Sequence, residues 1–538
     1  MRRTLIKVHP DDNVAVVLSD HKTGDRAELD GSEVIFATDA DAKHKIALTD
    51  LNAGDEIFMY GVLVGKAESD IPKGAALTIH NVKHQSAKVS GKTADFIWDA
   101  PDVSKWEDRT FNGYHRLDGQ VGTDNVWLFF PLVFCENRNI EVLKEVFEKE
   151  LLHKQADRHR LLLRSLIHNG GNELEDQPEP ETTPVFENIK VRFITHQGGC
   201  GGIRQDAVSL ARLLSGYLNN PNVAGATVLS LGCQNLQVDI FKSALKTINP
   251  DFQKPILIYE QQQEGTVDGM ISRIIKDSYA EIKKADQYVR EPAPLSKLKI
   301  GLECGGSDGF SGISANPVLG QVSDMLVALN GTAILSEFPE LCGVEQELVN
   351  RCVDNEKAER FLQLMQDFER SVVNAGSGFD MNPSPGNIKD GLITDAMKSA
   401  GAAKKGGTSP VVDVVDYGEY VNKPGLNLLC TPGNDVESTT AMAGAGANVI
   451  LFTTGLGTPT GNPVSPVVKV SSNSALAERM PDIIDVDTGA VITGEKSIQE
   501  MADELLEYII AVASGIIESK AMQLDQHDFI PWKRGVSL

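Results

Sequence analysis

The stretch "FITHQGGCGGIRQDA", residues 193–207, decides the fold because it joins two patterns of different period. Residues 189–195 are mostly apolar or β-branched, which is typical of a buried strand. After the loop, Ala207, Leu210, Ala211 and Leu214 recur at helical spacing. The four glycines between them allow close backbone approach and leave N–H groups free at the helix start. Taken alone, the loop fits either a ligand site or a tight turn around a buried cysteine.

The same strand–loop–helix order recurs through most of the chain. Strands are predicted at residues 126–134, 189–195, 226–231, 254–260, 298–303, 332–336, 426–429 and 448–453. Helices are predicted at 140–153 and 267–289, and after residues 207, 236 and 317. Strands that alternate with helices predict parallel or mixed sheets covered by helices. The first 90 residues differ, with short β runs at 14–18, 33–37, 56–60 and 76–80 and no helical period.

With 538 residues, the chain is too long for a single core. We predict an α/β fold class, with a small β module over residues 1–90 and a linker over 91–110. Two α/β domains follow, over residues 111–290 and 291–538, with the boundary at "EPAPLSK". The acidic, proline-containing segment 172–184 is predicted to be an exposed loop.

The composition excludes several classes of partner. Lys and Arg total 51 against 75 Asp and Glu, a net charge of −24, which disfavours nucleic acid and anionic membranes. No apolar run is long enough to span a bilayer, and the N-terminus lacks a signal-type apolar core. Seven cysteines in a chain of this length do not form a disulfide framework. We therefore expect a cytoplasmic protein with a small-molecule partner.

Five of the seven cysteines follow predicted strands: Cys135, Cys200, Cys233, Cys304 and Cys430. In open α/β sheets, ligands bind beyond the carboxyl ends of the strands. Core packing explains Cys135 and Cys430, which directly adjoin apolar runs. The other three lie among glycines and polar residues, in "HQGGCGG", "LGCQN" and "ECGGSDGFSG".

These three cysteines have three candidate roles. A nucleophile would need a base, and His196 is the only near neighbour in sequence. Glycine-loop packing is the second role. In the third, three thiolates hold zinc or an iron–sulfur cluster with one position open. We predict Cys200, Cys233 and Cys304 as metal ligands, with loop packing as the alternative.

Longer stretches carry a resemblance to a known family. They are "GYHRLDGQVGTDNVWLFFPLVFCENRN" (113–139), "LECGGSDGFSGISANPVLGQVSD" (302–324), "NPSPGN" (382–387) and "TPGNDVESTTAMAGAGANVILFTTGLGTP" (431–459). The chain resembles the altronate dehydratase/galactarate dehydratase family, and its first module resembles the family's SAF-type (β-clip) domain. It departs from the family pattern at Leu456, where a basic residue is usual, and in the "HQGGCG" loop.

The resemblance implies removal of water from a sugar acid to leave a 2-keto-3-deoxy acid. Such a reaction needs a base for the C2 proton, a cation for the enediolate and an acid for the C3 hydroxyl. The catalytic candidates are His44, Lys45 and His80. The candidates for substrate binding are Arg116, Asp118, Asn125, Glu337, Asn382, Ser384 and Asn387. The two lysines of "GAAKKGGT" (401–408) are further candidates to bind a carboxylate.

We expect iron as the cofactor, either as Fe²⁺ or as an iron–sulfur cluster, with Mn²⁺ as an alternative. The expected substrate is D-altronate, within hexuronate catabolism. Galactarate dehydration, sulfo-lyase action on a sulfonated hydroxy acid and non-catalytic binding of a sugar acid are the alternatives. A homo-oligomer remains an open expectation.

Overall fold

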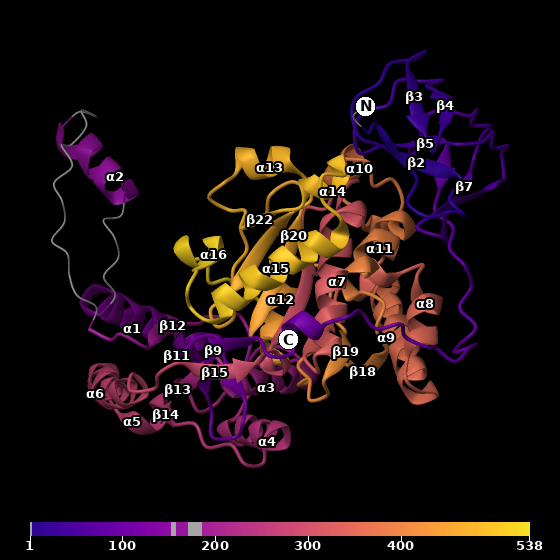
Figure 1. The fold of residues 1–538 in the computed structure, drawn as a ribbon. Helices are drawn as coiled ribbons and strands as arrows, with labels where there is room; N and C mark the ends of the chain where they lie inside the picture. The colour runs from indigo at the N-terminus through magenta and orange to yellow at the C-terminus, as the bar shows by residue number, and fades with distance from the viewer. Residues whose placement is uncertain (1–2, 152–157, 170–184) are drawn as a thin grey trace.

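The computed structural model describes residues 3–151, 158–169 and 185–538 of the chain. The acidic segment predicted as a loop at 172–184 lies outside these residues. A β module, an α/β domain with a four-stranded sheet and a larger α/β domain with a seven-stranded sheet follow one another (Figure 1). This confirms the predicted fold class. Among the described helices, none is long and apolar enough to cross a membrane.

The β module contains strands and turns and, within residues 3–90, no helix. One sheet joins β1 (Leu5–Ile6), β2 (Val14–Val17) and β5 (Lys45–Ala47). A hairpin pairs β3 (Arg26–Leu29) with β4 (Ser32–Ile35), and a third sheet joins β6 (Glu56–Met59), β7 (Val62–Ala67) and β8 (Val82–Lys83). The strand predicted at 76–80 was wrong. Ala76 makes only an isolated bridge to Ile46, and the Asn81 side chain then turns the chain by accepting from the Thr78 N–H.

The first α/β domain is built on a parallel sheet in the order β12-β11-β13-β14. Its strands are β12 (Lys190–Phe193), β11 (Val126–Pro131), β13 (Val223–Ser230) and β14 (Ile256–Glu260). Helices α3 (Arg204–Asn219) and α4 (Val238–Ile248) cover one face, and α1 (Asn137–Glu150) and α6 (Val267–Ala285) cover the other. Leu128 packs in the first cluster and Trp127 and Phe129 in the second. Burial on both faces explains why β11 is apolar throughout.

The larger domain is built on a parallel sheet in the order β18-β19-β17-β16-β20-β21-β22. Its strands are β18 (Val411–Val415), β19 (Gly425–Leu429), β17 (Thr332–Leu335), β16 (Lys299–Cys304), β20 (Val449–Thr454), β21 (Val467–Ser471) and β22 (Val486–Asp487). Helices α7 (Ala315–Ala328), α12 (Asp435–Gly444) and α15 (Ile498–Ala513) pack on it. Strands β18, β21 and β22 were not predicted.

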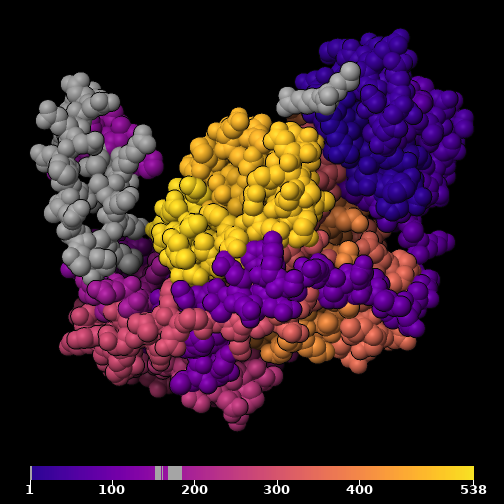
Figure 2. Space-filling model, viewed as in Figure 1, coloured from indigo at the N-terminus to yellow at the C-terminus, as the bar shows by residue number. Residues whose placement is uncertain are grey.

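The domains are joined closely. Helix α3 packs on α12 at Gly216, where a side chain would come within 1.9 Å of the Gly444 carbonyl. A small antiparallel sheet of β10 (Val121–Gly122), β9 (Thr110–His115) and β15 (Glu291–Pro294) spans the predicted domain boundary. The linker before it crosses the surface of the larger domain (Figure 2), with Trp106 buried. These contacts fix the carboxyl edges of both sheets relative to each other.

Candidate active site

Side chains of both charges gather at the carboxyl edge of the seven-stranded sheet. Strand β16 ends at Cys304, and Glu337 follows β17. Ligand atoms of Cys304, Glu337 and Glu340 lie within 4.8 Å of one another. Lys405 donates to Cys304 Sγ and to Glu337 Oε2, each at 2.7 Å. All four residues are buried, so solvent only weakly screens the attraction between the lysine and the carboxylates and the repulsion between the two carboxylates.

A second group lies next to the first and shares Glu337 with it. Oxygens of Glu303, Glu337 and Asp435 lie within 4.8 Å of one another. Ser438 donates to Glu303 Oε2 at 2.6 Å. The Oε1 atoms of Glu303 and Glu337 are buried and have no hydrogen-bond partner among the described residues. Because a buried carboxylate oxygen without a donor is costly, these two atoms indicate a place for a proton, a cation or a donor from a ligand.

The carboxyl groups of the site differ in pKa, which suits them to different roles. Burial opposes ionisation of Glu340, but the nearby Lys398 and Lys405 lower its pKa to about 2. Burial, and then the charges of Glu337 and Glu340, raise the pKa of Asp435 to about 7. A partly exposed carboxyl group that titrates near neutrality is suited to proton transfer. Glu337 also has a φ of 63°, in the left-handed region that residues other than glycine rarely adopt.

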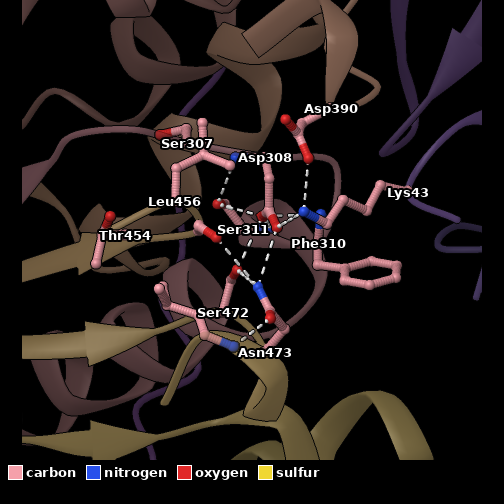
Figure 3. Close-up of polar contacts among 12 residues, drawn as sticks. Lys43, Ser307, Asp308, Phe310, Ser311, Asp390, Thr454, Leu456, Ser472 and Asn473 are labelled. Carbon is pink, nitrogen blue, oxygen red and sulfur yellow. Dashed lines mark hydrogen bonds and ion pairs between the residues drawn. The ribbon is translucent and has the colours of Figure 1, made fainter. Parts of the chain in front are cut away.

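The β module reaches the same edge through Lys43 (Figure 3). Its ammonium lies 3.2 Å from Asp308 and 2.7 Å from Asp390. Asp308 is fully buried and also accepts from the Ser311 hydroxyl, the Ser472 hydroxyl and the Asn473 amide (Figure 3). The loop after β16 is therefore fixed by the β module on one side and by the loop after β21 on the other.

Two glycines make this junction close. A side chain at Gly309 would come within 2.1 Å of the Lys43 carbonyl oxygen, and one at Gly391 within 2.3 Å. Lys43 itself has a φ of 77°. Only residues without a Cβ can enclose the Lys43 backbone in this way. The junction thus depends on two glycines of the larger domain and on the backbone conformation of Lys43 in the β module.

Comparisons with known proteins agree along the whole chain. Three family models match: "Altronate/galactarate dehydratase SAF domain" over residues 3–85, "D-galactarate dehydratase/Altronate hydrolase, second domain" over 113–286 and "D-galactarate/Altronate dehydratase, C-terminal" over 295–537. The chain is 35% identical to an altronate dehydratase of Bacillus subtilis over 100% of both chains. It is 35% identical to an altronate dehydratase of Escherichia coli over 95% of both.

The chain belongs to the galactarate/altronate dehydratase family. The resemblance read from the sequence is confirmed, and the chain is an enzyme of the hydro-lyase class. It is also 32% identical to the galactarate dehydratase (L-threo-forming) of Escherichia coli, over 95% of this chain and 92% of that one.

The dehydratase brings two of the three predicted catalytic residues to the junction. The His44 ring lies 3.0 Å from the Lys389 carbonyl through Nε2. Lys45 is buried and donates to the Gly391 carbonyl at 2.6 Å, and burial lowers its pKa to about 7 although Asp308 opposes this. His80 is exposed on a turn of the β module instead.

Three predicted substrate residues lie at the other edge of the four-stranded sheet. Arg116, Asp118 and Asn125 precede β11, so they lie at its amino end. Arg116 donates to the carbonyls of Pro221 and Asp124 and to the Asn125 side chain. The Asp118 side chain is exposed and accepts from Gln120. These bonds hold the turn before β11, and the part predicted for the three residues in substrate binding stays a prediction.

The "NPSPGN" loop adjoins the site at the seven-stranded sheet. Asn382 donates to Glu340 at 3.3 Å and accepts from Lys398 at 2.6 Å. Asn387 donates to the Ser307 carbonyl at 2.7 Å, next to Asp308. Ser384 is used as the N-cap of the short helix α10 (Pro385–Lys389), in a capping box with Asn387. Of the predicted substrate residues, Glu337 and Asn382 are thus brought together around Glu340, and Asn387 lies against the loop of Asp308.

The predicted cysteine trio is divided between the two sheets, and its part as a set of cluster ligands stays a prediction. Cys200 and Cys233 follow strands of the four-stranded sheet, whereas Cys304 ends a strand of the seven-stranded sheet. Among the described residues, no group of ligand atoms within 4.8 Å contains all three. Two thiolates on one zinc lie at most about 4.6 Å apart, so the three cannot share such an ion. The thiol of Cys304 instead contacts Lys405 and Glu340.

His196 cannot serve as the base of a nucleophilic cysteine. It is buried, and burial lowers its pKa to about 4. Nδ1 accepts from the Gly198 N–H at 3.1 Å, so the proton is on Nε2, which donates to the Pro131 carbonyl at 2.8 Å. Both ring nitrogens are therefore used to hold the cysteine loop against the end of β11.

A cavity of about 350 Å³ borders the Cys200 loop. The C-terminal segment, including Phe529, Trp532 and Lys533, forms the other wall. The same segment is bonded to α12 through the Ile530 N–H and Thr440. The C-terminus thus lies against both domains, close to the loop after β12.

Several residues of the site were missed by sequence reasoning. They are Lys43, Glu303, Asp308, Glu340, Asp390, Lys398 and Asp435. Glu303, Asp308 and Asp435 lie in the motifs that carried the family resemblance, and Lys405 lies in the "GAAKKGGT" segment singled out for its lysines. The usable signal was a charged residue within a glycine-rich turn after an apolar run.

Proposed function

We propose that this chain dehydrates a sugar acid, altronate first and galactarate second, to a 2-keto-3-deoxy acid. The observation that carries the proposal is the group of carboxylates and lysines at the carboxyl edge of the seven-stranded sheet. It supplies the charges that abstraction of a proton next to a carboxylate requires. Full-length similarity to altronate dehydratases supports altronate as the first substrate.

The residues are assigned by their geometry. Glu337 Oε1, which has no partner, takes the proton from C2 of the substrate. Asp435, with its pKa raised to about 7, gives a proton to the C3 hydroxyl, which leaves as water. The resulting enol becomes the ketone by taking a solvent proton at C3. Lys398, beside Glu340 and Asn382, provides positive charge for the substrate carboxylate.

The junction with the β module keeps this arrangement in place. Lys43 and Asp308 fix the loop that follows Cys304, and Lys45 donates to the Gly391 carbonyl at the same junction. We include iron in the proposal, because free thiols and carboxylates of suitable type lie at the two sheet edges. When bound, iron supplies a Lewis acid for the carboxylate and the departing hydroxyl. The proposal places the enzyme in the cytoplasm, where thiols stay reduced.

The test is a substrate panel under anaerobic conditions with iron-loaded enzyme. Altronate, galactarate and 2-sulfolactate are incubated separately, and 2-keto-3-deoxy product and sulfite are measured. Glu337→Gln is expected to lower kcat about 10²–10⁴-fold. The matched control is Glu356→Gln, since Glu356 is exposed and pairs with the neighbouring Lys357, far from the carboxylates of the site in sequence; it should leave kcat unchanged. Binding of altronate without any product would contradict the proposal.

A second candidate activity has one specific observation in its favour. The chain is 31% identical to the (2R)-sulfolactate sulfo-lyase subunit beta of Chromohalobacter salexigens, over 78% of this chain and 97% of that one. Loss of sulfite from such a substrate needs the same proton abstraction at C2. Release of sulfite without dehydration of either sugar acid would favour this activity.

A further inference from the structure

The ammonium of Lys405 lies between Cys304 and Glu337, and the segment that carries it is held by buried charges on two other helices. Lys405 belongs to the short 3-10 turn η7 (Ala403–Gly406), and its side chain is buried. Its Nζ atom is 2.7 Å from Cys304 Sγ and 2.7 Å from Glu337 Oε2. The lysine loop is here residues 403–409, which lead from this turn toward β18. Because a buried side chain has little freedom of its own, the contacts that hold the lysine loop also place the ammonium.

Asp324, on helix α7, binds the N–H groups of the lysine loop. Its carboxylate is buried. It accepts from the N–H and the hydroxyl of Thr408, each at 2.8 Å, and from the Ser409 N–H at 2.9 Å. Burial of a carboxylate is costly, and these hydrogen bonds offset the cost only while the loop keeps this conformation.

Arg351, the last residue of helix α8 (Glu345–Arg351), binds the carbonyl groups of the same loop. Its guanidinium is buried. Nε and Nη2 donate to the Ser409 carbonyl at 3.0 and 2.8 Å, and Nη2 also donates to the Gly406 carbonyl at 3.1 Å. The planar guanidinium fixes the direction of these carbonyls as well as their distance. Ser409 is thus bound by an acid at its N–H and by a base at its carbonyl.

The lysine loop also lies directly against helix α7. Gly407 has a φ of 58°, and a side chain there would come within 2.4 Å of Asp324 Oδ1. A side chain at Gly320, one turn earlier on α7, would come within 2.1 Å of the Lys404 carbonyl oxygen. Only residues without a Cβ permit these two approaches. The loop therefore has no room to shift toward the helix.

The linker supports both charged residues from outside. Lys92 donates to the carbonyls of Asn350 and Cys352, at 2.8 and 2.7 Å, and these two residues flank Arg351. Trp98 donates from Nε1 to the Thr408 hydroxyl at 3.2 Å. The contacts that hold the lysine loop thus extend from helix α7 to the linker.

We propose that Asp324 and Arg351 are positioning residues for the dehydration, and that they set the Lys405 ammonium between Glu337 and Cys304. Lys405 binds Oε2 of Glu337, whereas Oε1 of the same carboxylate has no partner among the described residues and takes the C2 proton in the proposed function. If the lysine loop relaxes, Glu337 loses this ion pair and its carboxylate is free to turn. Lys398, assigned to the substrate carboxylate, lies outside the lysine loop, so the chemical step should suffer more than binding. The inference rests on the proposed function for its purpose.

The test combines crystal structures of variants of the full chain with kcat and KM for the sugar acid that the panel identifies. In Asp324→Ala, Lys405 should leave Glu337, and kcat should fall by up to about 10²-fold with little change in KM, since a small misplacement near the reacting atoms costs about that much. Asp324→Asn should keep most of kcat, because its oxygen still accepts from the N–H groups of Thr408 and Ser409 and its amide can donate to the Thr408 hydroxyl.

The matched control concerns a second arginine that holds backbone carbonyls. Arg290 donates to the carbonyls of Asn112, Ala513 and Thr123, away from the lysine loop. Arg351→Lys should lower kcat more than Arg290→Lys does, because a lysine cannot hold two carbonyls with the fixed geometry of a guanidinium. Circular dichroism is used to verify that each variant is folded. If Asp324→Ala does not fold, the comparison of Arg351→Lys with Arg290→Lys decides.

Two results would overturn the assignment. One is a folded Asp324→Ala variant in which Lys405 keeps its contacts with Glu337 and Cys304. The other is an Arg351→Lys variant that loses no more of kcat than Arg290→Lys. A wild-type chain that dehydrates no sugar acid would contradict the proposed function, whereas displacement of Lys405 in the structure of Asp324→Ala would still show that Asp324 places it.

Discussion

Replacement of Asp308 by asparagine tests whether the loop after β16 depends on a buried carboxylate. Oδ1 accepts from the Phe310 N–H, from the N–H and hydroxyl of Ser311 and from the Ser472 hydroxyl. Oδ2 accepts from Asn473 at 3.2 Å and pairs with Lys43 at 3.2 Å. In Asp308→Asn, one of the two positions becomes an NH₂ group that faces only donors. The less costly orientation keeps Oδ1 and loses the two partners of Oδ2.

The magnitude follows from those two partners. A hydrogen bond to a charged group contributes about 1.5–3 kcal/mol, so the variant should lose about 3–5 kcal/mol of stability. In the variant, Lys43 still pairs with Asp390, so the loss of its contact with residue 308 costs less stability than it would without that second partner. The control is Ser472→Ala, which removes one of four donors to Oδ1 and should cost about 1.5 kcal/mol.

The assay is urea unfolding followed by circular dichroism, together with kcat on the substrate that the panel identifies. Asp308→Asn should shift the transition to lower urea and reduce kcat more than Ser472→Ala does. A loss of stability below about 1 kcal/mol, or one smaller than that of Ser472→Ala, would refute the reasoning.

Three further predictions follow from the same region. The pKa of Asp435 is raised from 3.8 to about 7, so at pH values between these two the folded chain binds more protons than the unfolded chain. The free energy of unfolding should therefore fall as the pH rises from about 4 to 7. Asp435→Asn should flatten this dependence in melting temperatures measured over that pH range. Gly309→Ala should displace the β module, because the added Cβ would meet the Lys43 carbonyl oxygen, and proteolysis within residues 91–110 should become faster. Gly386→Ala is the control, since an added Cβ there has its nearest neighbour 3.8 Å away. Equal cleavage rates in the two variants would contradict the packing argument. His44→Ala should lower kcat more than His80→Ala does, because His44 contacts the Lys389 carbonyl at the junction whereas His80 is exposed on a turn; equal effects would remove His44 from the site.

Periodicity predicted the architecture well because strands buried on both faces leave long apolar runs. Strand β11 and helix α6 were both recognised in this way, with small errors at their ends. Strands β18 and β21 were missed, and both are only five residues long. Their pairing with β19 and β20 is what gives such short segments their structure.

The site was harder to predict, because it depends on sheet order. The sequence shows that Cys135, Cys200, Cys233 and Cys304 each follow a strand, but it does not show which strands are neighbours. Only the order β12-β11-β13 shows that the strands before Cys135 and Cys200 are neighbours and that Cys304 ends a strand of the other sheet. The same holds for Arg116, whose motif is conspicuous but whose place is the amino edge.

The acid–lysine group shows a second limit. Glu303, Glu337, Lys405 and Asp435 come from four segments far apart in the sequence, and their contacts arise only once the seven-stranded sheet has formed. Glu337 was predicted from its position after an apolar run, and the lysines were singled out in a glycine-rich segment. The sequence pattern does not show that Lys405 and Glu337 form an ion pair, which the structure has at 2.7 Å.

The most direct test of the central claim is the fate of hydrogen at C3 during turnover. Altronate is incubated in D₂O with iron-loaded enzyme, and the product is examined by NMR and mass spectrometry. If the C2 proton is removed, the C3 hydroxyl leaves and the enol takes a solvent proton, the 2-keto-3-deoxy product carries one deuterium at C3. Product without deuterium at C3, or unchanged altronate from a folded, iron-replete enzyme, would contradict the account.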